Sequence, residues 1–454
     1  MSFVAVNAAP QQRPSDPCAD QLTDSRLVAA ARHLARRVED STMLSSLCAV
    51  ADQAIISGTS FVTAVVIGRC CGGGTLGVYA LVTSALAILT GIQDQLITAP
   101  YVLYHHRQHG RTRARYRGSV LLHQWLWIAA LLGLSGLLVT TVPASATGLI
   151  MGRTLAVALP FLLLRAFVRE MELAHCRMLP LLLLDAALCG GQLLTLGVLL
   201  ASGSVNLVTL YAAAGAGGLL AGGLWWSLQR ATFRFCRFAV VIHWQRNWRF
   251  GRWALATHLA GCSTPYVMPW VLYAVCGESE TGRLASASVV VGVANLLLSG
   301  LADFLTPRAS RAYAEGGTTA LRSVLRSMLW LSLLTIGSLC AVAALAGQWV
   351  VDLLYDGRFA GTGWIITLLT LSVLANAVGN VAGNGLWALD RPRANFVADM
   401  MTLITAIAAA PAFIHPYGAT GAALSTLIAC TMGAALRQLI LQQALRESGR
   451  QSMS

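Results

Sequence analysis

Long apolar runs separated by short polar segments dominate the chain from residue 46 to residue 440. A helix needs about 20 apolar residues to cross the hydrocarbon core of a bilayer, and about twelve runs meet that length. The pattern predicts an all-α polytopic membrane protein. The expected spans are roughly 46–69, 76–101, 119–142, 147–168, 178–201, 206–228, 253–275, 284–305, 327–347, 363–388, 396–415 and 418–440.

Composition agrees with this pattern and excludes other classes of protein. The chain has 454 residues, of which 56% are hydrophobic and 11% charged, whereas soluble domains carry about 25% charged residues. The mean hydropathy is +0.64. An ordinary soluble enzyme, a disordered protein and a secreted disulfide scaffold are therefore excluded. The spans leave no room for a large nucleotide-hydrolysing domain.

The distribution of arginine predicts the orientation. All 32 basic residues are arginine, and they give a formal net charge of +13. If the N-terminus is cytoplasmic, only Arg69, Arg153, Arg283 and Arg358 fall toward the opposite side. Short cytoplasmic loops are enriched in basic residues, so both termini are expected in the cytoplasm of a bacterial inner-membrane protein. Arginines spread over short loops do not predict nucleic-acid binding.

The spans group into two halves with a linker between them. We expect a cytoplasmic N-terminal segment (1–45), an N-lobe with spans 1–6 (46–228), a linker (229–252), a C-lobe with spans 7–12 (253–440) and a cytoplasmic tail (441–454). In the linker, arginine alternates with phenylalanine and tryptophan, as in a helix that lies in the membrane interface. An ordinary aromatic belt without a mechanical role would give the same pattern.

A weak internal repeat supports two halves. TGIQDQLITAP ends the second span (90–100), and SGLADFLTP ends the eighth (299–307). Both place an aspartate, a leucine, a threonine and a proline before a cytoplasmic loop. Two six-span repeats would be parallel and related by an axis along the membrane normal. Chance similarity between apolar helices is the competing interpretation.

Five charged residues lie within spans of the first half, toward the cytoplasmic side. They are Asp52, Asp94, Arg165, Arg169 and Asp185. Charges in the membrane are costly, so a mutually neutralising cluster is expected. Arg165 and Arg169 share one helix face because they are four residues apart. The cluster could form a cytoplasmic gate, a first contact for a substrate phosphate or a coupling site. Structural ion pairing near helix ends is the alternative.

Uncharged polar residues mark two further spans. Gln53, Ser57 and Ser60 form a stripe on the first span. Asn376, Asn380 and Asn384 recur every four residues on the tenth span, beside Gly379 and Gly383. Such asparagines either bond to a neighbouring helix or contact sugar hydroxyls, whereas the glycines permit close helix packing.

The seventh span contains His258, Pro265 and Pro269. Two prolines four residues apart free backbone carbonyls and suggest a hinge. His258 could titrate near neutral pH and take part in coupling, or be simply solvated near the end of the span. The eleven cysteines include no Cys-x-x-Cys pair, and we expect no metal and no cofactor.

Enzyme motifs are also missing from the sequence. There is no phosphate-binding loop of the G-x-x-x-x-G-K-[ST] type. No Ser/His/Asp set or carboxylate pair lies in a predicted outside loop. A membrane-embedded enzyme of glycan assembly is therefore less favoured than a transporter.

Residues 51–104 resemble the opening of bacterial polysaccharide-export flippases, which belong to the multidrug/oligosaccharidyl-lipid/polysaccharide (MOP) superfamily. In that family one span often ends in Ala-Arg-x-Leu-Gly-Pro and the next opens with Phe-Gly-x-Tyr-Ala-Leu. The matching residues are Arg69, Gly72, Gly77, Tyr79, Ala80 and Leu81. Cys71 and Gly73 replace the expected leucine and proline. The RFGRW before the seventh span and the Asp-Arg-Pro-Arg turn at 390–393 are also similar.

This resemblance implies two six-helix lobes in a V around a central cavity, and alternating access for a polyprenyl-pyrophosphate-linked oligosaccharide. Membrane lipids and other polysaccharide-assembly proteins would be partners. The central cavity of such flippases is commonly cationic, but our register places no arginine at mid-membrane in the second half. Arg69, Arg153 and Arg165 are the nearest candidates for pyrophosphate. Lipid II is another possible cargo, and a cation-coupled multidrug extruder of the same fold is the first alternative function.

Overall fold

The computed structural model describes residues 42–141, 146–175 and 177–451. Most of the expected N-terminal segment 1–45 therefore lies outside the described residues. The described part is helical, and it contains these elements in chain order: α2 (Thr42–Gln93), the π-helix η1 (Asp94–Thr98), α3 (Ala99–His105), α4 (Gly110–Thr141), α5 (Ala146–Ala174), α6 (Met178–Ala201), α7 (Leu207–Gln229), the 3-10 helix η2 (Arg230–Thr232), α8 (Arg237–Tyr355), α9 (Gly363–Ala388) and α10 (Pro392–Gln451).

Glycines divide the long helices into membrane-length segments. Eight described helical stretches are long and apolar enough to cross a membrane. Three of them contain non-helical residues, at Gly72 in α2, at Gly277 and the pair Gly316–Gly317 in α8, and at Gly418 in α10. These four breaks divide the eight stretches into twelve segments. The predicted all-α polytopic fold is confirmed, and the number of spans agrees with the hydrophobic pattern.

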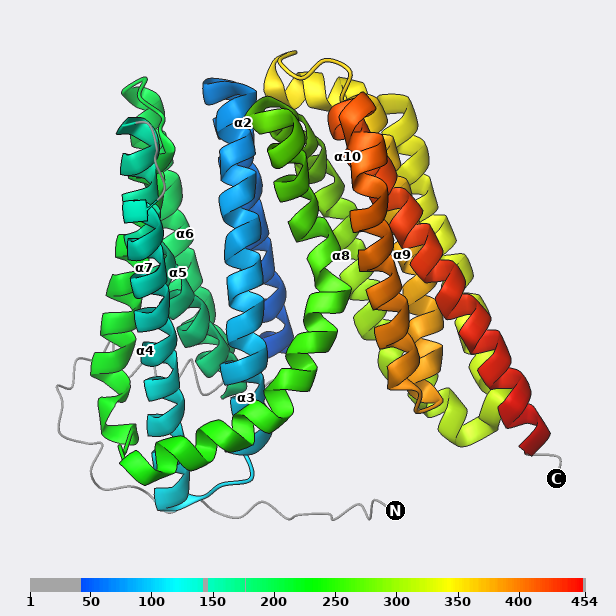
Figure 1. The fold of residues 1–454 in the computed structure, drawn as a ribbon. Coiled ribbons are helices and arrows are strands. Elements are labelled where there is room, and N and C mark those ends of the chain that lie inside the picture. The colour runs from blue at the N-terminus through cyan, green and yellow to red at the C-terminus, as the bar shows by residue number, and fades with distance from the viewer. Residues whose placement is uncertain (1–41, 142–145, 176, 452–454) are drawn as a thin grey trace.

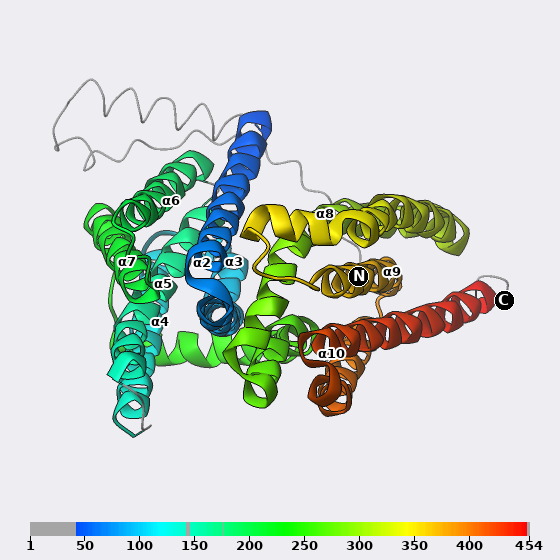
Figure 2. The same cartoon turned by 90° about the horizontal axis from the view of Figure 1, so that it is seen from above.

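The helices form two lobes that meet at one end and diverge toward the other (Figure 1). One lobe contains α2 and α4 to α7, and the other contains most of α8 together with α9 and α10. Figure 2 shows α4 to α7 on one side of α2, and α9 and α10 on its other side. The lobes diverge toward the end of the molecule where α10 finishes (Figure 1).

The junction between the lobes depends on close backbone contact. A Cβ atom added to Gly77 would lie 3.0 Å from the backbone nitrogen of Gly282, and one added to Gly282 would overlap the backbone of Gly73. The Arg69 guanidinium donates a hydrogen bond of 3.3 Å to the carbonyl oxygen of Leu353. Glycine is required here because any larger side chain would separate the two lobes.

The first two spans of each lobe are connected in the same way. Gly72 has φ 81° and ψ −173°, and Gly277 has φ 80° and ψ −168°. Each glycine lies between the first and second spans of its half. The shared conformation supports the internal repeat that the motifs at 90–100 and 299–307 suggested, because chance similarity of apolar helices would not reproduce a left-handed break.

The linker helix is continuous with the seventh span. α8 begins at Arg237 and has no non-helical residue before Gly277, so the boundary expected at residue 252 is not a break. Its first turns are bonded to the N-lobe: the Tyr116 hydroxyl donates to Asn247 Oδ1 at 3.0 Å, and His243 Nδ1 lies 2.8 Å from the Ser119 hydroxyl. Similarly, α10 continues through most of the expected tail to Gln451.

Candidate functional site

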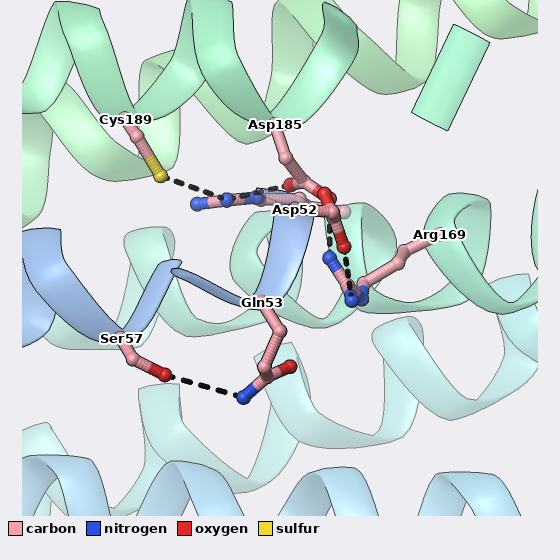
Figure 3. Close-up of polar contacts among 7 residues, drawn as sticks. Asp52, Gln53, Ser57, Arg169, Asp185 and Cys189 are labelled. Atoms are coloured by element: carbon pink, nitrogen blue, oxygen red, sulfur yellow. Dashed lines mark hydrogen bonds and ion pairs between the residues drawn. The ribbon is translucent and has the colours of Figure 1, made fainter. Parts of the chain in front are cut away.

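Three helices of the N-lobe bring four charged side chains together, as Figure 3 shows for Asp52, Arg169 and Asp185. Arg169 on α5 binds Asp52 of α2 at 2.6 Å and also pairs with Asp185 of α6. Arg165, one turn earlier on α5, binds Asp185 at 2.8 Å and lies near the Cys189 sulfur. We call these four residues the N-lobe cluster. Four of the five residues that the sequence suggested are therefore neighbours.

The N-lobe cluster is electrically balanced. Two aspartates face two arginines, so the group carries no formal net charge. Asp52 and Asp185 are 2% and 0% exposed, whereas the arginine side chains remain 21% and 24% exposed. Such mutual compensation is what makes ionised groups tolerable in a membrane. One acceptor remains: among the described residues, buried Asp52 Oδ1 has no hydrogen-bond partner.

Asp94 does not belong to this cluster, which corrects one expectation from the sequence. It begins the π-helix η1, and its carboxylate accepts a hydrogen bond of 3.1 Å from the Thr98 hydroxyl. Its side chain forms no ion pair with a described residue. A π-helix is rare and appears mostly as a single turn inside an α-helix, and the α-helical spacing in the sequence did not predict one here.

Polar stripes line one span of each lobe. On α2, Gln53 donates to Ser57 at 3.2 Å, and Gln53 and Ser60 are exposed. A second stripe, absent from our sequence-based candidates, lies on the α8 segment after Gly277. Its exposed members are Ser288, Asn295, Ser299 and Thr306. Their spacings of seven, four and seven residues place them on one helix face. This stripe could therefore have been predicted from the sequence.

The asparagine stripe on α9 has a partly structural role. Asn384 accepts a hydrogen bond of 2.7 Å from Thr306, which connects α9 to α8. The neighbouring glycines permit close packing: a Cβ atom on Gly379 would lie 3.3 Å from the Ala434 Cα atom, and one on Gly383 would lie 3.1 Å from Asn395 Oδ1. Asn376 and Asn380 are only half-buried, so their side chains are the accessible part of this stripe.

The C-lobe contains an ion pair that our sequence analysis missed. Asp399 and Arg437 lie on the two halves of α10, either side of Gly418, and form a salt bridge. Their side chains are 14% and 12% exposed. A Cβ atom on Gly261 of the seventh span would lie 3.2 Å from Asp399 Oδ2. The sequence could have predicted this ion pair, because each of the two residues is a lone charge within a predicted span.

The remaining candidates lie away from the N-lobe cluster. Arg69 bonds at the lobe junction, and Arg153 lies three turns before Arg165 on α5, roughly 18 Å away along the helix. His258 packs against Gly91 of α2. Pro265 and Pro269 lie within helical α8, whose breaks are at glycines instead. Both prolines line a cavity of 260 Å³ at the lobe junction. Within the described ranges, no group of three metal-ligating side chains occurs.

Comparisons with known proteins define the fold class. No protein-family model matches the chain, and no curated protein matches it in sequence. A lipid II flippase, MurJ, in an inward closed conformation superimposes with a TM-score of 0.71 at 14% identity, and 91% of each chain is covered. An inward-facing MATE multidrug-resistance transporter of the MOP superfamily gives a TM-score of 0.66 at 13% identity, covering 89% of this chain and 96% of that one.

An outward-facing MATE transporter also matches, with a TM-score of 0.61 at 11% identity over 90% of this chain and 96% of that chain. The fold is therefore that of MOP-superfamily membrane transporters and flippases, and these structural neighbours are not enzymes. At such low identity the comparisons establish the fold alone.

Proposed function

We propose that this protein is a flippase that moves a polyprenyl-pyrophosphate-linked oligosaccharide across the bacterial inner membrane by alternating access. The observation that carries the proposal is the charge balance of the N-lobe cluster within a fold shared with a lipid II flippase. An unpaired carboxylate would favour a cationic drug, whereas Asp52 and Asp185 are already paired with arginines. Those arginines remain partly exposed and are suited to phosphate, which binds guanidinium bidentately.

The polar stripes suit the glycan. Hydroxyl-rich sugars are recognised by uncharged donors and acceptors, and Gln53, Ser60, Asn295 and Ser299 are exposed. In our proposal, Arg165 and Arg169 receive the pyrophosphate near the cytoplasmic mouth, and Asn376 and Asn380 contribute to the glycan path. Arg69 and Arg153 would meet the phosphate later, near the opposite face. The prolines of the seventh span would let α8 bend as the lobes rock.

The test combines genetics with lipid analysis. In a deletion strain of the source organism, we expect polyprenyl-pyrophosphate oligosaccharide to accumulate and surface polysaccharide to fall, both measured by mass spectrometry and glycan quantification. The intact gene should restore both. Unchanged lipids and surface glycan would refute the proposed cargo.

Arg165 provides the residue-level test. Arg165→Ala should reduce complementation by at least about tenfold while the protein remains in the membrane, because one charge-assisted contact is worth about 1.5–3 kcal/mol. Arg446→Ala is the matched control, since Arg446 is exposed on α10. Full complementation by Arg165→Ala would remove this residue from the mechanism.

A cation-coupled multidrug extruder is the second candidate, and Asp94 favours it. This carboxylate is half-buried and has no arginine partner among the described residues. The extruder predicts that Asp94→Asn abolishes resistance to amphipathic cations in a drug-sensitive host. If the intact protein also gives the host no resistance to amphipathic cations, this candidate function is refuted.

A further inference from the structure

A cavity of 390 Å³ lies where the second and third spans meet the linker helix. Its walls are formed by Ile92 of α2 and Leu96 of η1, Leu126 and Ala130 on α4, and Val240 and Trp244 on α8. Ligand sites usually have volumes of about 300–1,000 Å³. Leu126 is 64% exposed, so this wall reaches the outer surface of the N-lobe. The cavity is large enough to hold part of a lipid chain.

Two polar atoms at this cavity have no partner among the described residues. His123 is 3% exposed, and its Nε2 atom pairs with the Val240 carbonyl oxygen at 3.1 Å, which leaves Nδ1 unpaired. Trp127 Nε1 is also buried and unpaired. Both residues line the cavity. Because the indole N–H can only donate, it requires an acceptor oxygen, and leaving it unsatisfied is unfavourable.

The adjoining part of α8 is strongly basic. No acidic residue occurs between Arg230 and Gly277. Arg237 is exposed and precedes Val240 and Val241 by one helical turn, so it lies on the helix face that borders the cavity. The neighbouring Phe238 and Ile242 are 84% and 63% exposed. An exposed apolar face flanked by arginines is typical of a helix at the surface of an anionic membrane.

We propose that this cavity binds one anionic phospholipid of the surrounding membrane. One acyl chain fills the apolar cavity, an ester oxygen accepts from Trp127 Nε1, and the phosphate lies against Arg237. A soluble anion would leave the cavity unfilled, and a zwitterionic lipid would leave the excess arginine charge uncompensated. The lipid contacts α2, α4 and the linker part of α8, so it stabilises the attachment of the linker to the N-lobe. This site is independent of the cargo.

The experiment uses the full-length protein in detergent, with added dioleoyl phosphatidylglycerol or dioleoyl phosphatidylcholine. We expect phosphatidylglycerol to raise the melting temperature more, and native mass spectrometry to detect one retained lipid. Ala130→Trp should remove most of this rise by filling the cavity. Arg237→Gln should weaken lipid binding about fivefold, the value expected for one arginine near an anionic surface.

Two control variants separate this site from general effects. Ala129→Trp adds the same side chain to an exposed neighbour that does not line the cavity, and Arg446→Gln removes an exposed arginine elsewhere. Both should respond to phosphatidylglycerol as the unchanged protein does. Equal effects of the two lipids would overturn the anionic assignment. Undiminished lipid retention by Ala130→Trp would overturn the cavity as the site.

Discussion

The two lobes place an aspartate at the same position and neutralise it differently. Asp185 is the eighth residue of α6, and Asp399 is the eighth residue of α10, so each lies near the start of the fifth span of its half. In the N-lobe, Arg165 and Arg169 come from the fourth span. In the C-lobe, the fourth span carries asparagines, and Arg437 of the sixth span supplies the charge.

This difference determines which helices the charges connect. The N-lobe cluster connects α2, α5 and α6, and α2 contributes the span with the Gln53–Ser60 stripe. The C-lobe pair connects only the two halves of α10. The N-lobe therefore connects its polar stripe to an ionic network of three helices, whereas in the C-lobe Arg437 reaches the asparagine span at Gly379, where an added Cβ atom would lie 3.0 Å from its Nη1 atom.

The largest effect is expected for Asp185→Asn. This change leaves Arg165 without a carboxylate partner in the cluster and Arg169 with Asp52 alone, and breaking a buried pair costs about 3–5 kcal/mol. We expect a large fall in melting temperature in detergent and in membrane yield. Asp390→Asn, at an exposed turn, is the control. A stable Asp185→Asn protein would show that the cluster does not hold the N-lobe together.

The C-lobe pair should contribute less. Asp399→Asn and Arg437→Gln each remove one charge-assisted bond, worth about 1.5–3 kcal/mol. Because the residues are direct partners, the double variant should lose less than the sum of the single losses, with a coupling of about 0.5–3 kcal/mol. Thermal unfolding of the four proteins measures this coupling. Strict additivity would mean that the pair has no net energetic role.

Gly72→Ala and Gly277→Ala test whether the helix breaks between the first and second spans of the two lobes are equivalent. Both glycines have φ near 80°, and no atom lies within 4 Å of an added Cβ atom at either position. Each alanine should therefore cost about 1–3 kcal/mol through backbone strain alone. Gly337→Ala, within a helix and without close neighbours, should not destabilise the protein. Clearly unequal costs for the first two variants would argue against equivalent breaks.

The smallest effect concerns the attachment of the linker to the N-lobe. Burial, with a further contribution from Arg246, lowers the pKa of His243 below 6.5. As the pH falls below that value, the unfolded chain takes up this proton before the folded protein, so stability decreases. Melting temperatures measured from about pH 7.5 to about pH 5.5 should therefore fall less for His243→Gln. His109→Gln, at an exposed position, should keep the full pH dependence.

The sequence determined the membrane class, the spans and all four members of the N-lobe cluster, to which it wrongly added Asp94. Apolar length predicts a span because the hydrocarbon core has a fixed thickness. Lone charges in spans predict pairing because an isolated charge is costly there. Asp94 was wrongly grouped with the cluster, because its carboxylate accepts a hydrogen bond from Thr98 and forms no ion pair with a described residue. The same reasoning would have predicted the pairing of Asp399 with Arg437, because each is a lone charge within a predicted span.

Tertiary structure decided what these local rules leave open. The close contact between Gly77 and Gly282 cannot be predicted from the length of the apolar runs. The same is true of the continuation of α8 from the linker into the seventh span, because neither feature depends on apolar length. The partner of each carboxylate was also fixed only in three dimensions. Asp185 and Asp399 have equivalent sequence positions, yet helix packing supplies α5 arginines to one and an α10 arginine to the other. Burial makes a counter-charge necessary, and the neighbouring helices determine which one it is.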